Sequence, residues 1–179
     1  MADSTNPHNS SKCPRTLTDD ERSKLDKDTT MISDFKREKL EKEAIKNWDL
    51  FYKRNSANFF KDRHWTTREF QELLCDQNQP DQKTVKVILE AGCGVGNFFY
   101  PLLEEGYNLY INACDCSPRA VQFVKDHSLY NPSQVNAFCC NLTQDQLTDN
   151  IQESSVDIAT LIFVLSAIRP DKMLKVLQN

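Results

Sequence analysis

Glycine is scarce in this chain, which has only four among its 179 residues. Three of them, Gly92, Gly94 and Gly96, stand in one short turn between an apolar run and a segment with helical spacing. Glycine is required where the backbone takes a positive φ or where a ligand approaches the main chain closely. A strand, a glycine turn and a helix N-terminus form the arrangement that binds nucleotide-like cofactors through backbone N–H groups. The near absence of glycine elsewhere therefore marks this turn as the candidate cofactor loop.

Long apolar runs and paired cysteine motifs are also missing. No apolar run approaches the roughly 20 residues of a membrane-spanning helix, and residues 1–15 lack the apolar segment of a secretory signal. The seven cysteines include no Cys-x-x-Cys pair; Cys114 and Cys116 are one residue apart, and Cys139 and Cys140 are adjacent. Neither spacing is usual for zinc. We expect no membrane partner, no metal, and reduced cysteines in a cytoplasmic protein that can also be nuclear.

A net charge of −4 excludes a global nucleic-acid footprint, but the charge is unevenly distributed. Residues 35–70 carry ten Lys/Arg against six Asp/Glu, together with both tryptophans and five of the ten phenylalanines. Basic residues interleaved with aromatics can contact phosphates and stack on bases. The alternative is an amphipathic helix with a solvated face of mixed charge, and composition alone leaves both open.

Helical signals dominate the first part of the chain. The patterns at 18–21 and 66–69 predict capped helix starts, and apolar residues from Phe35 to Tyr52 recur at helical spacing, which predicts a helix with an aromatic stripe. The polar segment 76–83, which contains Pro80, is the best linker candidate.

Beyond residue 83, strand and helix signals alternate. Strands are expected at 85–90, 109–115, 135–140 and 156–165, and helices at 97–105, at 118–127 and from Pro170. This order predicts a doubly wound parallel α/β sheet, in which the long apolar run at 156–165 is typical of a central strand. No later element covers the outer edge of that strand, so we expect a partial sheet and a chain truncated at its C-terminus. The predicted organisation is a disordered tail at 1–15, a helical extension at 16–79 and a Rossmann-like domain at 80–179, incomplete at its C-terminus.

The spacing of the loop favours one cofactor class over another. The loop reads G-x-G-x-G, not the dinucleotide pattern G-x-G-x-x-G, and Glu90 stands two positions before Gly92. A carboxylate here would repel a pyrophosphate and attract a cationic sulfonium cofactor with a free amino group, so S-adenosylmethionine is favoured over NAD. Asp115 ends the second strand, where a carboxylate accepts ribose hydroxyls in both classes. Asn141 follows the third strand and is a candidate for the adenine amino group, or a simple turn residue.

Five segments resemble the methyltransferase-like family of tRNA 3-methylcytidine methyltransferases, and most of all its serine-tRNA-modifying member. They are KNWDLFYKRN at 46–55, NFFKDRHW at 58–65, EAGCGVGN at 90–97, CDCSPRA at 114–120 and LIFVLSA at 161–167. The resemblance implies a class I, Rossmann-like S-adenosylmethionine-dependent enzyme that forms 3-methylcytidine at position 32 in the anticodon loop of serine tRNAs, with seryl-tRNA synthetase as a partner.

The resemblance also implies a set of cofactor-binding residues: Trp48, Tyr52, Gly92, Gly94, Asp115, Asn141, Leu142 and Ile162. In this set the two aromatic residues enclose the cofactor, Gly92 lies against its methionine part, Asp115 against the ribose, Asn141 near the adenine and Ile162 beside the reacting end. The family has Asp where this chain has Asn141, so we expect weaker binding. No catalytic residue is identified.

The basic and aromatic segment supplies the RNA-binding candidates. They are Lys53, Arg54, Lys61 and Arg63 for phosphates, and Trp65, Phe59 and Phe60 for stacking on an unpaired base. Two alternative functions remain at this point. One is a truncated, non-catalytic form that binds tRNA or the synthetase; the other, disfavoured by Glu90 and the glycine spacing, is an NAD-dependent oxidoreductase.

Overall fold

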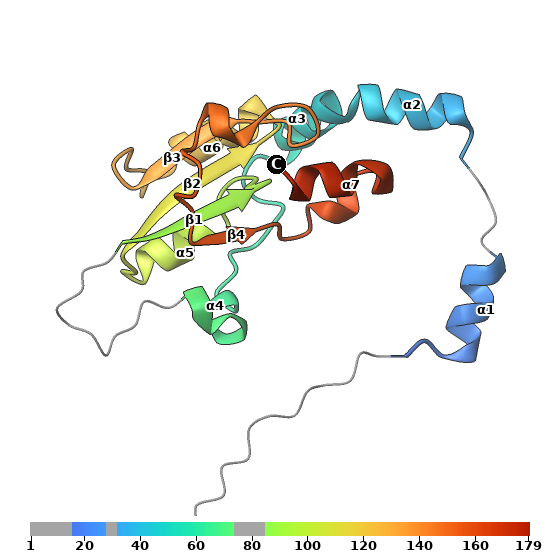
Figure 1. Ribbon diagram of the computed structural model, residues 1–179, viewed down its shortest axis with the longest axis horizontal. Helices are drawn as coiled ribbons and strands as arrows, with labels where there is room; N and C mark the ends of the chain where they lie inside the picture. The colour runs from blue at the N-terminus through green and yellow to red at the C-terminus, as the bar shows by residue number, and fades with distance from the viewer. Residues whose placement is uncertain (1–15, 28–31, 74–84) are drawn as a thin grey trace, which may run out of the picture. The chain divides into compact units, whose positions relative to one another are not determined.

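The computed structural model describes residues 16–27, 32–73 and 85–179 (Figure 1). The chain divides into two units, 1–39 and 40–179, each with its own internal contacts. The domain boundary expected at 79/80 and the expected linker lie outside the described residues. None of the helices within the described ranges has the length and apolarity needed to cross a bilayer.

The first unit contains α1 (Asp19–Lys27), and its start confirms one predicted capping box. The backbone N–H of Thr18 donates to Glu21 Oε2 at 2.9 Å, and the N–H of Glu21 donates back to Thr18 Oγ1 at 3.3 Å. These reciprocal bonds satisfy two of the amide groups that a helix start leaves without partners. The second predicted box is wrong: α4 (Thr66–Glu69) has Trp65 at its N-cap with no side-chain cap. The Thr66 hydroxyl instead donates to the carbonyl of Arg63 at 3.0 Å.

The second unit is built on a parallel sheet of order β3-β2-β1-β4 (Figure 1). Its strands are β1 (Lys86–Ala91), β2 (Leu109–Asp115), β3 (Val135–Cys139) and β4 (Ile158–Thr160). The first three agree with the sequence prediction to within one residue at each end. The chain moves outward from β1 to β3 and then returns to the other side of β1, so the strand order reverses between β1 and β4. Ligands of open α/β sheets bind beside the carboxyl ends of the strands at such a reversal.

Helices cover the sheet in the manner expected of a doubly wound fold. They are α5 (Phe99–Glu104), α6 (Pro118–Lys125) and α7 (Pro170–Leu177), with α2 (Asp34–Lys42) and α3 (Ala44–Asn55) preceding the sheet in sequence. Residues of α5 and α6 share one buried cluster with Ile88 and Ile111, whereas Val176 of α7 shares a second with Leu89 and Phe138. The adjacent residues Ile88 and Leu89 thus enter different clusters, because successive side chains of a strand point to opposite faces. The α/β prediction is confirmed.

Two predictions about element lengths are wrong. The expected helix from 35 to 52 is broken at Glu43, between α2 and α3. The expected strand at 156–165 has only three residues and lies at the edge of the described sheet, not at its centre. After Thr160 the backbone leaves the ladder: Phe163 has φ 60° and a short 3₁₀ helix follows at Leu165–Ala167. Leu161, Val164 and Leu165 pack beside the cluster around α7 instead of extending the strand.

Candidate functional site

A cavity of about 420 Å³ opens beside the carboxyl ends of the strands, all within the second unit. Its walls include every residue that the sequence assigned to cofactor binding: Trp48, Tyr52, Gly92, Gly94, Asp115, Asn141, Leu142 and Ile162. The elements α3, the loop after β1, the end of β2, and the segments after β3 and β4 contribute these residues. The fold therefore brings together positions more than a hundred residues apart in the sequence.

The glycine loop turns back over the end of β2 and is closely packed on both sides. The N–H groups of Gly92 and Cys93 both donate to the Cys114 carbonyl, at 2.8 and 2.9 Å. Gly92 has φ 74°, and a Cβ at this position would lie 2.5 Å from Cγ2 of Val164. At Gly94 a Cβ would lie 2.9 Å from the Tyr52 hydroxyl. Only glycine allows the loop to approach α3 and the segment after β4 this closely.

Two buried carboxyl groups lie at the ends of neighbouring strands. Glu90 is fully buried, and its Oε2 has no hydrogen-bond partner among the described residues. Burial raises the pKa of Glu90 well above its ordinary value, and the Arg63 charge opposes this effect. Asp115 is satisfied by backbone donors, since Oδ2 accepts from the Gly94 N–H at 3.0 Å and Oδ1 from the Ser117 N–H at 2.9 Å. Burial raises the pKa of Asp115, and these two amides oppose it.

The aromatic wall of the cavity is fixed in place by a residue that the sequence reasoning missed. Asp49, on α3, accepts from the Ser117 hydroxyl at 2.9 Å and from the Arg119 N–H at 3.2 Å through Oδ1. The hydroxyl bond is the main cause of a lowered pKa for Asp49. Ser117 is also the N-cap of α6, as the sequence predicted. The sequence held one indication of this contact. Asp49 is an acidic residue next to Trp48, and negative charge is favoured near the N-terminus of a helix such as α6.

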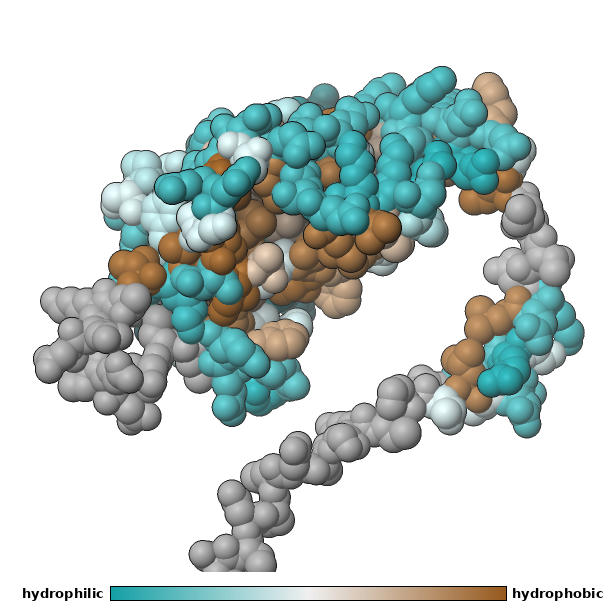
Figure 2. Space-filling model, viewed as in Figure 1, coloured by the Kyte–Doolittle hydropathy of each residue, from teal (hydrophilic) through white to brown (hydrophobic). Residues whose placement is uncertain are grey.

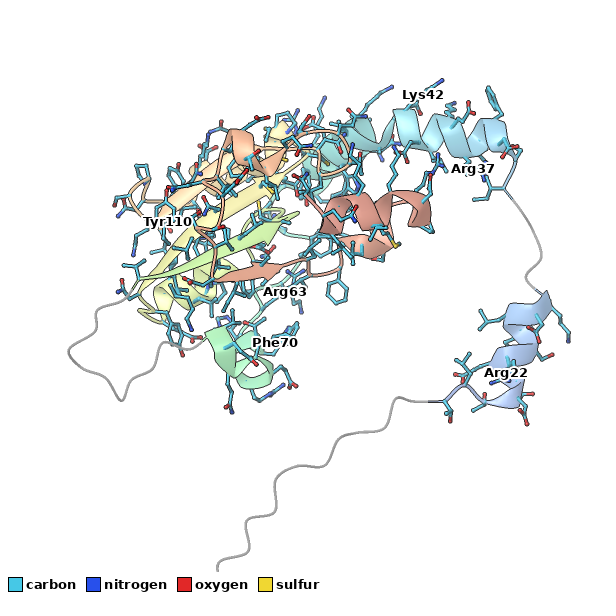
Figure 3. The ribbon with its side chains drawn as sticks, viewed as in Figure 1. Arg22, Arg37, Lys42, Arg63, Phe70 and Tyr110 are labelled. Carbon is cyan, nitrogen blue, oxygen red and sulfur yellow. The ribbon has the colours of Figure 1, made fainter. Side chains whose placement is uncertain are left out.

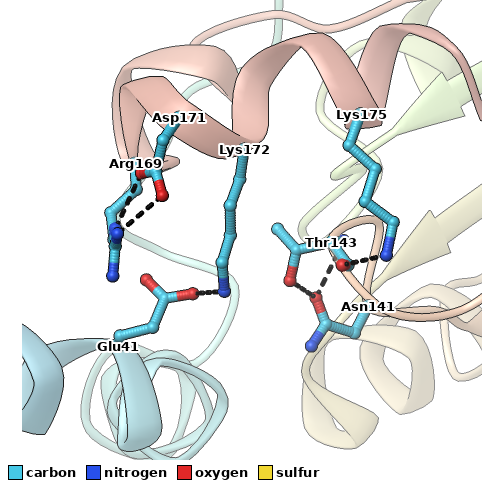
Figure 4. Close-up of polar contacts among 7 residues, drawn as sticks. All are labelled: Glu41, Asn141, Thr143, Arg169, Asp171, Lys172 and Lys175. Carbon is cyan, nitrogen blue, oxygen red and sulfur yellow. Dashed lines mark hydrogen bonds and ion pairs between the residues drawn. The ribbon is translucent and has the colours of Figure 1, made fainter.

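Asn141 lies in a turn that uses its side-chain oxygen internally (Figure 4). Its Oδ1 accepts from the N–H and the hydroxyl of Thr143, at 3.1 and 2.8 Å, while its own N–H donates to Asp145 Oδ2 at 2.7 Å. The acceptor that the sequence analysis reserved for an adenine amino group is thus already engaged. The side-chain amide nitrogen has no partner among the residues that the structure describes, so it is the group of Asn141 that remains for a ligand.

A salt bridge joins a residue of the cavity wall to α7. Lys172, on α7, pairs with Glu41 near the end of α2, and both side chains are about three-quarters buried (Figure 4). Arg169 at the start of α7 pairs with Asp171 at 2.6 Å and also lines the cavity. The pair of Lys172 and Glu41 was not found from the sequence, because residues 131 positions apart carry no local signal of contact.

The RNA-binding candidates separate into two groups. Arg63 and Phe60 line the cavity, whereas Lys53, Arg54, Lys61 and Trp65 are exposed outside it. Phe59 and Phe60 form an aromatic cluster with Phe51, whose ring centroid is 4.8 and 5.8 Å from theirs.

Phe163 is another cavity residue that was not predicted from the sequence. The Arg63 guanidinium lies over its ring, 5.6 Å from the ring centroid. The part of the chain that the structure describes contains no cluster of side chains suited to a metal ion.

Comparisons with known proteins agree with this geometry. A family model described as a methyltransferase domain matches residues 89–179. The tRNA N(3)-cytidine methyltransferase METTL6 of Homo sapiens is 59% identical over 165 residues, which are 92% of this chain and 57% of that protein. The tRNA N(3)-methylcytidine methyltransferase trm141 of Schizosaccharomyces pombe is 51% identical over 148 residues, 83% of this chain and 58% of that protein.

Among solved structures, the human methyltransferase 10 domain containing protein is 18% identical with a TM-score of 0.38, covering 65% of this chain and 59% of that one. The chain spans a little over half the length of the curated relatives that it matches.

Proposed function

Because the chain belongs to the methyltransferase-domain family, we propose that its cavity binds S-adenosylmethionine and that the protein methylates N3 of cytidine in tRNA. The sequence resemblance to tRNA 3-methylcytidine methyltransferases is confirmed by the relatives. The chain covers only part of those proteins, so the activity of the whole relatives enters here as part of the proposal.

One observation carries the cofactor assignment: the buried Glu90 carboxyl, with an oxygen that has no partner among the residues described, lies at the base of the glycine loop. A buried carboxylate without a partner is costly, and a cationic ligand is the natural way to satisfy it. S-adenosylmethionine carries both an amino group and a sulfonium. Asp115, at the end of the neighbouring strand β2, lines the cavity and is the candidate acceptor for a ribose, and Trp48 and Tyr52 supply an aromatic wall.

The methyl transfer requires no strong general acid or base. Cytosine N3 has a free lone pair at neutral pH, so the reaction needs the base and the methyl donor held in line and shielded from water. When bound, S-adenosylmethionine supplies the electrophilic methyl group. The residues of this chain orient the two partners, and the π faces and carboxylates of the cavity stabilise the positive charge that develops on the base.

We further propose that the tRNA is a serine isoacceptor, that the target is position 32 of the anticodon loop, and that seryl-tRNA synthetase assists. The support for these finer statements is the similarity of five sequence segments to the serine-tRNA-modifying member of the family. A cytoplasmic location, with a nuclear pool, belongs to the same proposal. The alternative is a non-catalytic form that binds tRNA or the synthetase through residues 35–70, whose net charge is +4.

Calorimetry with S-adenosylmethionine tests the cofactor site. We expect Asp115→Asn to weaken binding at least tenfold, because Asp115 lines the cavity. We expect the same of Glu90→Gln, because it removes the buried carboxyl group whose ionised form a cationic ligand would stabilise. Asp126→Asn is the matched control, since Asp126 lies at the exposed end of α6 outside the cavity. Excess NAD should not compete; competition by NAD, or equal affinity of all three variants and the wild type, would contradict the assignment.

Mass spectrometry of nucleosides then tests the reaction. Serine and threonine tRNA transcripts are incubated with the protein and S-adenosylmethionine, with and without seryl-tRNA synthetase. We expect 3-methylcytidine in the serine tRNA, and more of it with the synthetase. Cofactor and tRNA binding without any methylated nucleoside would favour the non-catalytic alternative.

A further inference from the structure

Phe163 combines two properties that are unfavourable for a bulky apolar residue. Its φ is 60°, in the left-handed region, where the other described non-glycine residues are Ser56 and Ser154. Its side chain is 75% exposed. Figure 2 shows apolar surface in the region of β4 and α7, the elements that precede and follow this residue in the sequence. A left-handed conformation is costly for a residue with a large side chain, and such strain clusters at sites that bind ligands. Packing does not explain why Phe163 adopts this conformation, because most of its side chain is exposed.

The position of the ring connects it to the cavity. Phe163 lines the cavity together with its neighbours Ile162 and Val164, and Val164 is the residue packed against Gly92 of the glycine loop. The ring therefore lies at the mouth of the cavity, on the same segment that closes its inner end. An exposed aromatic face at this place is next to the reacting end expected for a bound methyl donor.

A cation accompanies the ring. The Arg63 guanidinium lies 5.6 Å from the ring centroid, and Figure 3 labels Arg63 beside the segment that follows β4. Arg63 makes no ion pair with any described residue; the carboxyl group whose pKa it lowers, Glu90, is fully buried and does not line the cavity. The backbone N–H of Arg63 donates to the Asn97 carbonyl at 2.8 Å, which joins the main chain at Arg63 to the residue that follows the glycine loop. An aromatic face with a neighbouring unpaired cation is the combination that binds a nucleotide of a single strand.

We propose that Phe163 and Arg63 form the subsite for the acceptor nucleotide: an unpaired pyrimidine base stacks on the exposed face of the Phe163 ring, and Arg63 contacts its phosphate. This inference rests on the proposed function, because it assigns a place to the RNA substrate of the same site. The charge of +4 over residues 35–70 favours RNA over an apolar protein segment as the occupant, since residues 35–70 include Arg63 and contribute further residues to the cavity wall.

The test uses an RNA hairpin with a seven-nucleotide loop and the fluorescent base pyrrolocytidine at the target position. Emission of the probe reports whether the base leaves its own stack and joins a protein ring. We expect Phe163→Leu to reduce hairpin affinity by about 5- to 100-fold, the range for removing one base–aromatic stack. Phe163→Trp should retain affinity and alter the emission. Phe70→Leu is the matched control, because Phe70 is a half-exposed aromatic residue outside the cavity (Figure 3).

Calorimetry is run on the same variants with S-adenosylhomocysteine, the product that S-adenosylmethionine leaves after methyl transfer. This measurement separates the cofactor site from the nucleotide subsite. Unchanged cofactor binding with weakened hairpin binding in Phe163→Leu supports the inference. Equal hairpin affinity and emission in Phe163→Leu and wild type would overturn it. An equal loss of hairpin and cofactor binding would also overturn it, because the ring would then belong to the cofactor site. If the wild type binds the hairpin through Phe163 and yet binds no cofactor, the proposed function fails while the subsite stands.

Discussion

Replacing Gly92 by alanine isolates the cost of the close approach in the glycine loop. The new Cβ would lie 2.5 Å from Val164 Cγ2, about 1 Å closer than an ordinary van der Waals contact. Two costs add: about 1–2 kcal/mol for alanine in the left-handed region and about 1–3 kcal/mol for overpacking. Alanine also restricts the unfolded chain, which returns about 0.4–1 kcal/mol. We expect a loss of about 1–5 kcal/mol in the free energy of unfolding.

Gly106 provides a control with the same backbone requirement and no steric conflict. Its φ is 84°, and a Cβ there would meet no atom within 4 Å. Gly106→Ala should therefore cost only about 1 kcal/mol, the left-handed term less the gain from the unfolded state. The difference between the two variants measures the contact with Val164. Urea unfolding followed by circular dichroism gives both free energies.

A double-mutant cycle identifies the partner of the clash. Val164→Ala removes the Cγ2 methyl group, so it should rescue part of the Gly92→Ala loss, with a coupling of about 1–3 kcal/mol. If Gly92→Ala and Gly106→Ala differ by less than about 0.5 kcal/mol, or if the cycle shows no coupling, the close approach between the loop and the segment after β4 does not exist in solution.

Three further outcomes follow from the buried and paired charges. Because the pKa of Glu90 is raised, the folded state binds more protons than the unfolded state above pH 4.5, so the free energy of unfolding should fall as pH rises through the folded pKa. Glu90→Gln should remove this pH dependence, which urea titrations between pH 4.5 and 7.5 measure. Asp49→Ala should cost about 1–2 kcal/mol at pH 7 through its lost bond to Ser117; since the Asp49 pKa is lowered, the difference from wild type should shrink below pH 3.8. Lys172→Gln should weaken cofactor binding in calorimetry by about twofold to fivefold, and the reversed pair with Glu41→Lys and Lys172→Glu should restore it.

The sequence predicts the fold where local signals are strong. The strands around Ile88, Ile111 and Val135 are short apolar runs bounded by turns, and Ser117 with Pro118 marks a helix start unambiguously, so these elements agree with the structure. The strand predicted at 156–165 was too long, because periodicity cannot distinguish a long buried strand from a short strand followed by an irregular buried segment. The left-handed backbone at Phe163 has no sequence signature, since glycine or asparagine is the usual residue there.

The residues of the site likewise fall into those that local sequence patterns predict and those that they do not. The residues of the glycine loop and Asp115 are recognisable because the strand–turn–helix pattern places them at strand ends. Contacts between distant segments are invisible to such patterns. The pairing of Asp49 with Ser117, 68 residues apart, and the stacking of Arg63 on Phe163 depend on how α3 and the segment after β4 pack around the sheet. Likewise, the sequence suggests Asn141 as an acceptor and gives no indication that Thr143 already occupies its oxygen.

Ser117 has a consequence for how this site can change. Its N–H holds Asp115, its hydroxyl donates to Asp49, and the same oxygen accepts from Ala120 at the start of α6. The expected ribose acceptor therefore depends on the backbone of Ser117, and the helix that carries the aromatic wall depends on its side chain. Replacement of Ser117 by alanine would release the wall and leave the carboxylate in place, because only proline lacks the backbone N–H. A protein engineered for an enlarged cofactor analogue could accordingly gain room on the side of α3 without losing the acceptor at the end of β2.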